Sequence, residues 1–320
     1  MMKCERAARV LIALVNSELA DITCAILEMR SMYITIDAST PHVTVATKLL
    51  VLNMHQTIAG QRLIAALNAA GYRIFDITKA REFGRALGIN QDYIVECLYH
   101  LRKTNIIFSL KKGLYAISVN RDDIHKYEIA MALGRSAALS HASALEFHGC
   151  NCHDEIVYIT IPKGTMPRIG GSNCNISIIN NVKYQFVQTV ATEFFGVQQM
   201  WVGKSQIIVT NLERTLLDGL SKPKYCGGFA GLQAVFRDNL HRLDTDKLLR
   251  YSEKYDPAIS KRLGLVLSRC GLGLDILRSL LERSINGYVK LDPTGPNIGV
   301  FNKRWMLREN DDSHLAVITM

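Results

Sequence analysis

The sequence lacks any run of 18 or more consecutive apolar residues, the length that a membrane-spanning helix needs. It also lacks a recognisable signal peptide, because acidic Glu18 and Asp21 follow the short apolar run at residues 10–15 and no convincing cleavage site comes after it. These absences argue against a membrane partner and against secretion. With 48% apolar and 21% charged residues among 320, the composition is that of an ordinary globular protein, which we expect to be cytoplasmic.

A disulfide framework is lacking as well. The eight cysteines show no regular spacing and most fall inside apolar patterns, so reduced thiols are expected. One cluster, Cys150, Cys152 and His153, resembles a metal site, with Cys174 as a conceivable fourth ligand. The paired spacing of a zinc ribbon is missing, so we predict no bound metal and no cofactor.

Catalytic motifs are also missing. Gly203-Lys204-Ser205 resembles part of a phosphate-binding loop, but Gln198 stands where that motif needs its first glycine, and no helix is predicted to start at Ser205. No strand carries paired carboxylates with a nearby lysine. We therefore predict that the chain is not an enzyme, which disfavours a nuclease or transferase.

What the sequence does contain is a compact series of local signals between Thr57 and Ser118. A helical stripe of apolar residues ends at Gly71, and a shorter helix lies between a cap at Asp76 or Thr78 and a stop at Gly88. A third helix is predicted from Asn90. Two apolar strands within residues 107–117 then flank a basic turn, which predicts a β-hairpin. This order predicts a winged helix-turn-helix DNA-binding domain over residues 54–120.

The distribution of charge supports binding to phosphates. Residues 57–120 hold nine Lys and Arg against four Asp and Glu, a balance of +5 out of the chain's +9. Three-helix units also occur as pure packing modules, and that alternative stays open. In the DNA-binding interpretation, the third helix enters the major groove and the hairpin tip lies along phosphates. The predicted contacts are Gln91, Tyr93, Tyr99 and His100 near bases, and Arg102, Lys103, Lys111 and Lys112 on phosphates.

The flanking segments complete an expected α+β fold. Residues 1–53 form an extension of uncertain role, with one helical period and a possible strand at 33–37. Residues 121–320 are predicted to form a second domain, with a small mixed or antiparallel β-sheet and a C-terminal helical bundle. Its start is predicted as helix that continues through the small-residue segment 136–145, where His141 is expected to be structural, as is His148.

A helix at 212–220 is predicted to start with a capping box of Thr210 and Glu213. Arg214 and Asp218 are spaced as an i, i+4 pair that supports this helix. Four further helices are expected at 229–241, 245–253, 257–270 and 274–285, before an extended, turn-rich tail. The loop from Lys222 to Gly228 separates the helix at 212–220 from these four helices.

Several segments together carry a family resemblance. They are Gly113-Leu-Tyr, Leu139-Ser-His-Ala-Ser-Ala-Leu145, the strand ending at Pro162, Leu212-Glu-Arg-Thr-Leu-Leu-Asp218 and Pro223-Lys-Tyr-Cys-Gly-Gly228. With the winged module, they resemble AbiEi-type antitoxins of bacterial type IV abortive-infection systems over about residues 56–310. The resemblance implies a repressor that binds operator DNA of its own operon. It also implies a C-terminal domain that counteracts a nucleotidyltransferase-like toxin encoded beside it, without a stable complex.

Within that second domain, the turn-rich loop suggests a surface that meets a partner. We take Lys222, Lys224 and Tyr225 as the candidate antitoxin surface. The alternative interpretation is a winged-helix transcription regulator whose C-terminal domain senses a ligand or forms a dimer, with no toxin partner.

Overall fold

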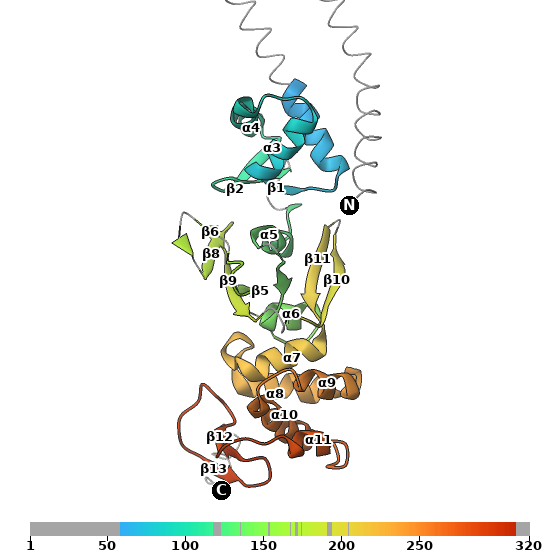
Figure 1. Ribbon diagram of the computed structural model, residues 1–320, viewed down its shortest axis with the longest axis vertical. Helices are drawn as coiled ribbons and strands as arrows, with labels where there is room; N and C mark the ends of the chain where they lie inside the picture. The colour runs from blue at the N-terminus through green and yellow to red at the C-terminus, as the bar shows by residue number, and fades with distance from the viewer. Residues whose placement is uncertain are drawn as a thin grey trace, which may run out of the picture. The chain divides into compact units, whose positions relative to one another are not determined.

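The computed structural model describes residues 58–117 and 123–311, apart from residues 135, 153, 167, 170, 171, 174, 191–193 and 204. The fold is α+β, and its contacts divide the chain into two compact units, Met1–Ile124 and His125–Met320 (Figure 1). The expected helix and strand in residues 1–53 lie outside the described residues, as do His153 and Cys174 of the cysteine cluster.

The first unit places its helices on a small antiparallel sheet with the strand order β1-β3-β2. Residues 58–69 are helical, and the carboxylate of Asp76 caps the next helix by accepting the amide of Lys79 at 2.7 Å. Leu63, Ile94 and Leu98 meet in a fully buried core. The elements are β1 (Ile74–Asp76), α3 (Ile77–Ala86), the 3-10 turn η1 (Gln91–Tyr93), α4 (Ile94–Lys103), β2 (Ile107–Lys111) and β3 (Leu114–Ile117).

The second unit is built on a six-stranded mixed sheet with the order β10-β11-β4-β5-β9-β8. β5 and β9 run parallel, as do β11 and β4, and the remaining neighbours are antiparallel. The strands are β4 (Ala138–Leu139), β5 (Ile156–Pro162), β8 (Ile176–Ile179), β9 (Val182–Thr189), β10 (Val197–Val202) and β11 (Ser205–Thr210), with β6 (Arg168–Ile169) and β7 (Ser172–Asn173) as a separate pair.

The segment expected to continue as helix over residues 136–145 is interrupted, so that prediction was wrong. α5 (Lys126–Leu133) ends, Ala138 and Leu139 form the strand β4, and only then does α6 (His141–Phe147) begin. Leu139 pairs with Ile159 on one side and with Val209 on the other. These distant pairings override the helix propensity of the alanine-rich sequence.

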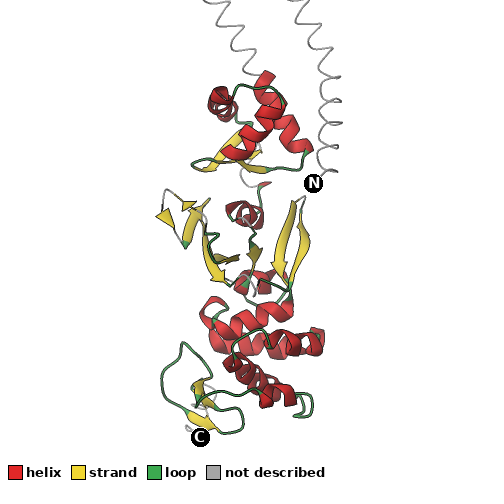
Figure 2. Cartoon of the chain, viewed as in Figure 1, coloured by secondary structure: helices red, strands yellow, loops and turns green. Residues whose placement is uncertain are grey.

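The helices that follow the large sheet along the chain lie between it and a small C-terminal sheet (Figure 2). They are α7 (Leu212–Ser221), η4 (Pro223–Tyr225), α8 (Gly228–Asn239), η5 (Leu240–Arg242), α9 (Thr245–Ser252), α10 (Pro257–Arg269) and α11 (Arg278–Glu282). The predicted capping box at the start of α7 is wrong by one residue. Asn211 caps the helix by accepting the amide of Arg214, while the Thr210 hydroxyl donates to the carbonyl of Leu139.

α10 is held against the C-terminal segment by one close approach. Trp305 is 2% exposed, and its indole lies so close to Gly264 that a Cβ at that position would overlap the ring. Glycine is therefore required in the middle of a helix, where it is ordinarily unfavourable. The extended tail forms a three-stranded sheet of β12 (Val289–Lys290), β13 (Val300–Asn302) and β14 (Leu307–Glu309).

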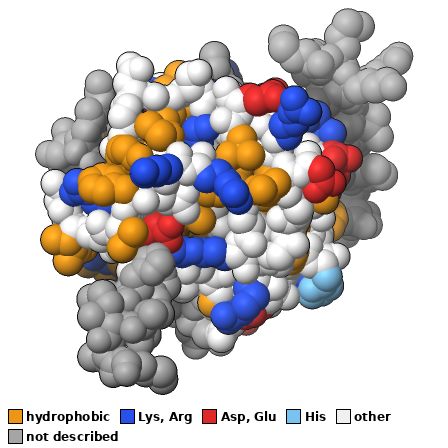
Figure 3. Space-filling view, turned by 90° about the horizontal axis from the view of Figure 1, so that it is seen from below, with side chains coloured by type: hydrophobic (Ala, Val, Ile, Leu, Met, Phe, Trp, Pro, Cys, Tyr) orange, Lys and Arg blue, Asp and Glu red, His pale blue; other side chains and the backbone are white. Residues whose placement is uncertain are grey.

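The surface at this end of the second unit mixes apolar and basic side chains (Figure 3). Tyr288 and Phe301 are exposed and lie edge to face at 4.7 Å between ring centres. The guanidinium of Arg308 covers the Phe301 ring at 4.6 Å.

Candidate functional site

The exposed face of α4 carries four of the eight residues predicted to contact bases or phosphates. Tyr99 is 59% exposed, and Arg102 and Lys103 are exposed near the helix end. His100 is half-buried, and its Nε2 lies 3.8 Å from the carboxylate of Glu96. The opposite face of α4, with Ile94, Leu98 and Leu101, is buried in the core as the helical spacing predicts.

The hairpin that follows α4 presents one lysine more freely than the other. Lys112 is exposed, whereas Lys111 is half-buried and burial lowers its pKa. Gly113 completes the turn with a φ of 80°, a left-handed conformation that favours glycine. Lys112 is therefore better placed than Lys111 to contact an external phosphate.

Gln91 and Tyr93 are engaged with the protein itself. Both belong to the 3-10 turn η1 before α4, and the side-chain amide of Gln91 donates to the carbonyl of Arg81 at 3.2 Å. The Tyr93 hydroxyl is buried beside the Cys97 thiol, and burial raises its pKa to about 12. The sequence predicted a helix from Asn90, whereas these two residues form a 3-10 turn and α4 begins only at Ile94.

The three candidate residues of the antitoxin surface point to different surroundings. Lys224 is exposed, and its ammonium lies 4.8 Å from the centre of the Tyr225 ring. The Tyr225 ring packs inward, 5.4 Å from His141 and 5.2 Å from Tyr158. Lys222 is half-buried and lines a cavity. Only Lys224 of the three is an exposed surface residue.

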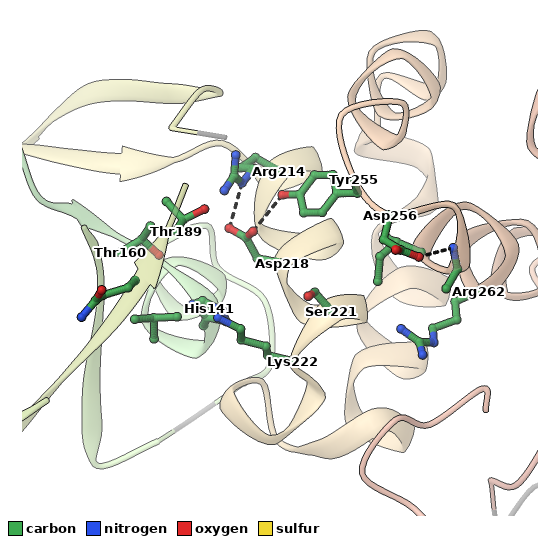
Figure 4. Close-up of a pocket in the computed structure, with 14 residues that line it drawn as sticks. His141, Thr160, Thr189, Arg214, Asp218, Ser221, Lys222, Tyr255, Asp256 and Arg262 are labelled. Atoms are coloured by element: carbon green, nitrogen blue, oxygen red, sulfur yellow. Dashed lines mark hydrogen bonds and ion pairs between the residues drawn. The ribbon is translucent and has the colours of Figure 1, made fainter. Parts of the chain in front are cut away.

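That cavity, of about 380 Å³, lies inside the second unit between the sheet and the helices α7 and α10. Figure 4 shows Thr160 and Thr189 on the sheet side, with Asp218 and Ser221 of α7 on the other side. Thr160 pairs with Val187, and Pro162 with Thr189, where the parallel strands β5 and β9 approach their carboxyl ends. Ligands commonly bind beyond the carboxyl ends of parallel strands.

A buried ion pair forms one wall of the cavity. The Nε of Arg214, a residue that is 2% exposed, donates to the carboxylate of Asp218 at 2.9 Å, and the Tyr255 hydroxyl donates to the other carboxylate oxygen at 2.8 Å. The guanidinium also stacks over Phe195, 4.3 Å from the ring centre. The i, i+4 pair predicted from the sequence is therefore present, but it lies in the interior and faces the cavity.

His141 lies at the edge of the same cavity in a strained conformation. Its φ of 51° is left-handed, which is rare for a residue other than glycine and is often found at functional sites. Burial lowers its pKa to about 4; Lys222 and Arg214 act in the same direction, and Asp218 opposes them. The imidazole is thus neutral near pH 7, and its Nδ1 lies 2.9 Å from the Ser140 hydroxyl. His148 bonds the carbonyl of Thr210 at 2.7 Å, which fits the structural role expected for it.

The cysteines near His153 lie in the core. Cys150 and Cys152 are buried, and burial raises both thiol pKa values, that of Cys152 to about 11. Within the part of the chain that the structure describes, no three His, Cys, Asp or Glu side chains are arranged to hold a metal ion. None of the helices described is long and apolar enough to cross a membrane.

Comparison with known proteins shows a similar fold among solved structures. No family model matches the sequence, and no curated protein matches it. A solved structure that is similar is the crystal structure of RV2827C protein from Mycobacterium tuberculosis, with a TM-score of 0.53 and 14% sequence identity. The match covers 82% of this chain and 95% of that chain. At this identity the likeness shows the fold alone.

Proposed function

We propose that the chain is a DNA-binding transcriptional autoregulator and an antitoxin of the AbiEi type. In this proposal the first unit is a winged helix-turn-helix that represses its own operon. The second unit counteracts a nucleotidyltransferase-like toxin encoded there, without a stable complex, and the chain is not an enzyme. The observation that carries the proposal is the exposed face of α4, which is followed directly by a basic β-hairpin.

The roles of the individual residues follow from their exposure. Arg102, Lys103 and Lys112 are exposed cations suited to phosphates, while Tyr99 and His100 lie on the same helix face and are the candidates for base contacts. Lys111 is placed to make a weaker phosphate contact, since its side chain is half-buried.

The test is binding of duplex DNA from upstream of the gene, measured by gel shift over a range of salt concentrations. Removing Lys111 and Lys112 as K111Q/K112Q should weaken binding to all sequences alike and lower the salt slope by about one unit per lost contact. The matched control is K224Q, an exposed lysine of the second unit, which should bind like the wild type. Equal affinity of the wing variant and the wild type at every salt concentration would overturn the assignment.

The cavity of the second unit favours a second candidate function, a winged-helix regulator whose C-terminal domain senses a ligand. Only the antitoxin proposal requires a toxin encoded beside this chain. Expression of a neighbouring nucleotidyltransferase-type gene should arrest growth, and co-expression of this chain should restore it if the antitoxin proposal holds. If expression of the neighbouring gene leaves growth unaffected, the regulator proposal is favoured.

A further inference from the structure

The strand β10 is an open edge of the six-stranded sheet in the second unit. Among the described residues it pairs with β11 on one side only, and it is the last strand in the sheet order (Figure 1). The ladder with β11 runs without a bulge over all six residues of β10. Natural sheets commonly protect an edge with charges, prolines or bulges, and Val197-Gln-Gln-Met-Trp-Val202 has none of these. The outer side of β10 is therefore open to another strand.

The register of the hairpin decides which main-chain groups of β10 face outward. Val202 and Ser205 flank a two-residue turn, so these two residues exchange both hydrogen bonds of their pair. Bonding alternates along an antiparallel ladder, and the even-numbered residues of β10 therefore bond to β11. The N–H and C=O groups of Val197, Gln199 and Trp201 consequently point away from the sheet.

The same three residues carry exposed side chains on one face of the hairpin. Trp201 is 65% exposed and Val197 is 37% exposed, while Gln199 between them is also exposed. On the opposite face, Ile207 and Val209 of β11 are buried in the core. Tryptophan is a frequent anchor of protein interfaces, because burying its large ring removes much apolar surface from water. The free main-chain groups of β10 thus lie beside an exposed apolar anchor.

We propose that two copies of this chain pair through β10, antiparallel about a two-fold axis at Gln199, so that their sheets become continuous. In this register Val197 of each copy lies opposite Trp201 of the other copy, as the symmetry of a two-fold interface requires. The outward groups of the three residues then form about six main-chain hydrogen bonds across the axis. An aromatic and a β-branched side chain opposite each other also stabilise a strand pair.

Charge and residue order favour a second copy as the occupant of this edge. The chain has a net charge of +9, so two copies repel each other across much of their surface, whereas neither β10 nor β11 contains a charged residue. The outward residues follow the order apolar, amide, apolar, which reads the same in both directions. The Gln199 amide is both donor and acceptor, so it can bond its equivalent across the axis. This inference concerns the second unit alone and holds for either candidate function.

The test is sedimentation velocity of the full chain without DNA, at concentrations from about 1 to about 100 µM. The wild type should change with concentration from the chain mass of 35.8 kDa toward twice that mass, with a dimer Kd in the micromolar range. Q199K places two lysines opposite each other at the axis and should raise the Kd at least about tenfold, as should Q199E with two glutamates. An equal mixture of Q199K and Q199E should form dimers again, because each lysine then faces a glutamate.

Two controls separate this edge from other surfaces. Q206K adds the same charge on β11, at an exposed glutamine that pairs with Trp201 one strand further from the axis, and K111Q/K112Q changes the hairpin of the first unit. Both should dimerise like the wild type, even where the hairpin variant has lost DNA binding. The proposal is overturned if the wild type stays monomeric or forms larger polymers, or if Q199K and Q199E dimerise like the wild type. It is also overturned if their mixture gains nothing over each alone, or if Q206K weakens the dimer as much as Q199K.

Discussion

Replacing His141 with asparagine should remove a defined part of the acid sensitivity of the second unit. Asparagine tolerates the left-handed φ of 51° and does not titrate. Burial lowers the pKa of His141 to about 4 from an ordinary value of 6.5. The folded protein therefore keeps this imidazole neutral at pH values where the unfolded chain protonates it.

The sign and size of the effect follow from that difference. The folded-state pKa is depressed, so the full stability is present above pH 6.5 and is lost as the pH falls toward 4. The loss attributable to His141 is about 2 kcal/mol at pH 5 and about 3 kcal/mol at pH 4. Asp218, Lys222 and Arg214 are the charged groups that act on the imidazole.

The two tryptophans of the chain make the assay specific. Trp201 and Trp305 both belong to the second unit, and Trp305 is buried, so tryptophan fluorescence reports the unfolding of that unit. Urea unfolding of the wild type and H141N should be measured at pH 7, 6, 5 and 4. The difference in the free energy of unfolding between the two proteins at pH 7 gives the packing cost of the substitution. The change in that difference at lower pH gives the contribution of His141 protonation. If H141N loses as much stability as the wild type between pH 7 and pH 4, the reasoning is wrong.

Two further predictions use the same fluorescence signal, and a third adds assays of growth and of DNA binding. G264A should destabilise the second unit by about 1–3 kcal/mol, because the added methyl overlaps a buried indole. G231A, on the exposed face of α8, should stabilise the unit by up to about 1 kcal/mol. Destabilisation by both substitutions would refute this reasoning. D218N should cost about 3–5 kcal/mol by removing the carboxylate that pairs with the buried guanidinium of Arg214, whereas D238N, which breaks an exposed pair, should cost at most about 1 kcal/mol; similar losses would contradict it. Residues 121–320 should unfold cooperatively and protect cells from the toxin, while residues 54–120 bind DNA only; rescue by residues 54–120 alone would show that repression explains protection.

Much of the first unit could be predicted because its signals are local. Gly71 and Gly88 end their helices in left-handed conformations, and Asp76 caps α3 as its position suggests. The strand β1 could not be predicted, because three residues carry little periodicity and it exists only by pairing with β3. The 3-10 turn before α4 was missed for a similar reason, and it changes the surroundings of Tyr93.

The cavity was beyond sequence reasoning because its residues are assembled from distant elements. Thr160 comes from β5, Lys222 from the end of α7 and Arg262 from α10, and no short motif links them. The i, i+4 spacing of Arg214 and Asp218 revealed a pair but not its burial. The mistaken capping box shows the same limit, since the hydroxyl of Thr210 serves a carbonyl 71 residues away.

The two-residue strand β4 has a consequence for how the second unit forms. It lies in the middle of the six-stranded sheet and joins the β10–β11 hairpin to β5 through a single register pair, Leu139 with Val209. Bringing those residues together closes a long loop. The chain loses entropy in closing this loop before the new contact contributes any stabilising free energy. We therefore expect the β10–β11 hairpin to form early by itself and to join the sheet late. In native-state hydrogen exchange, the amides of β4 should then open together with those of β11 as one cooperative step.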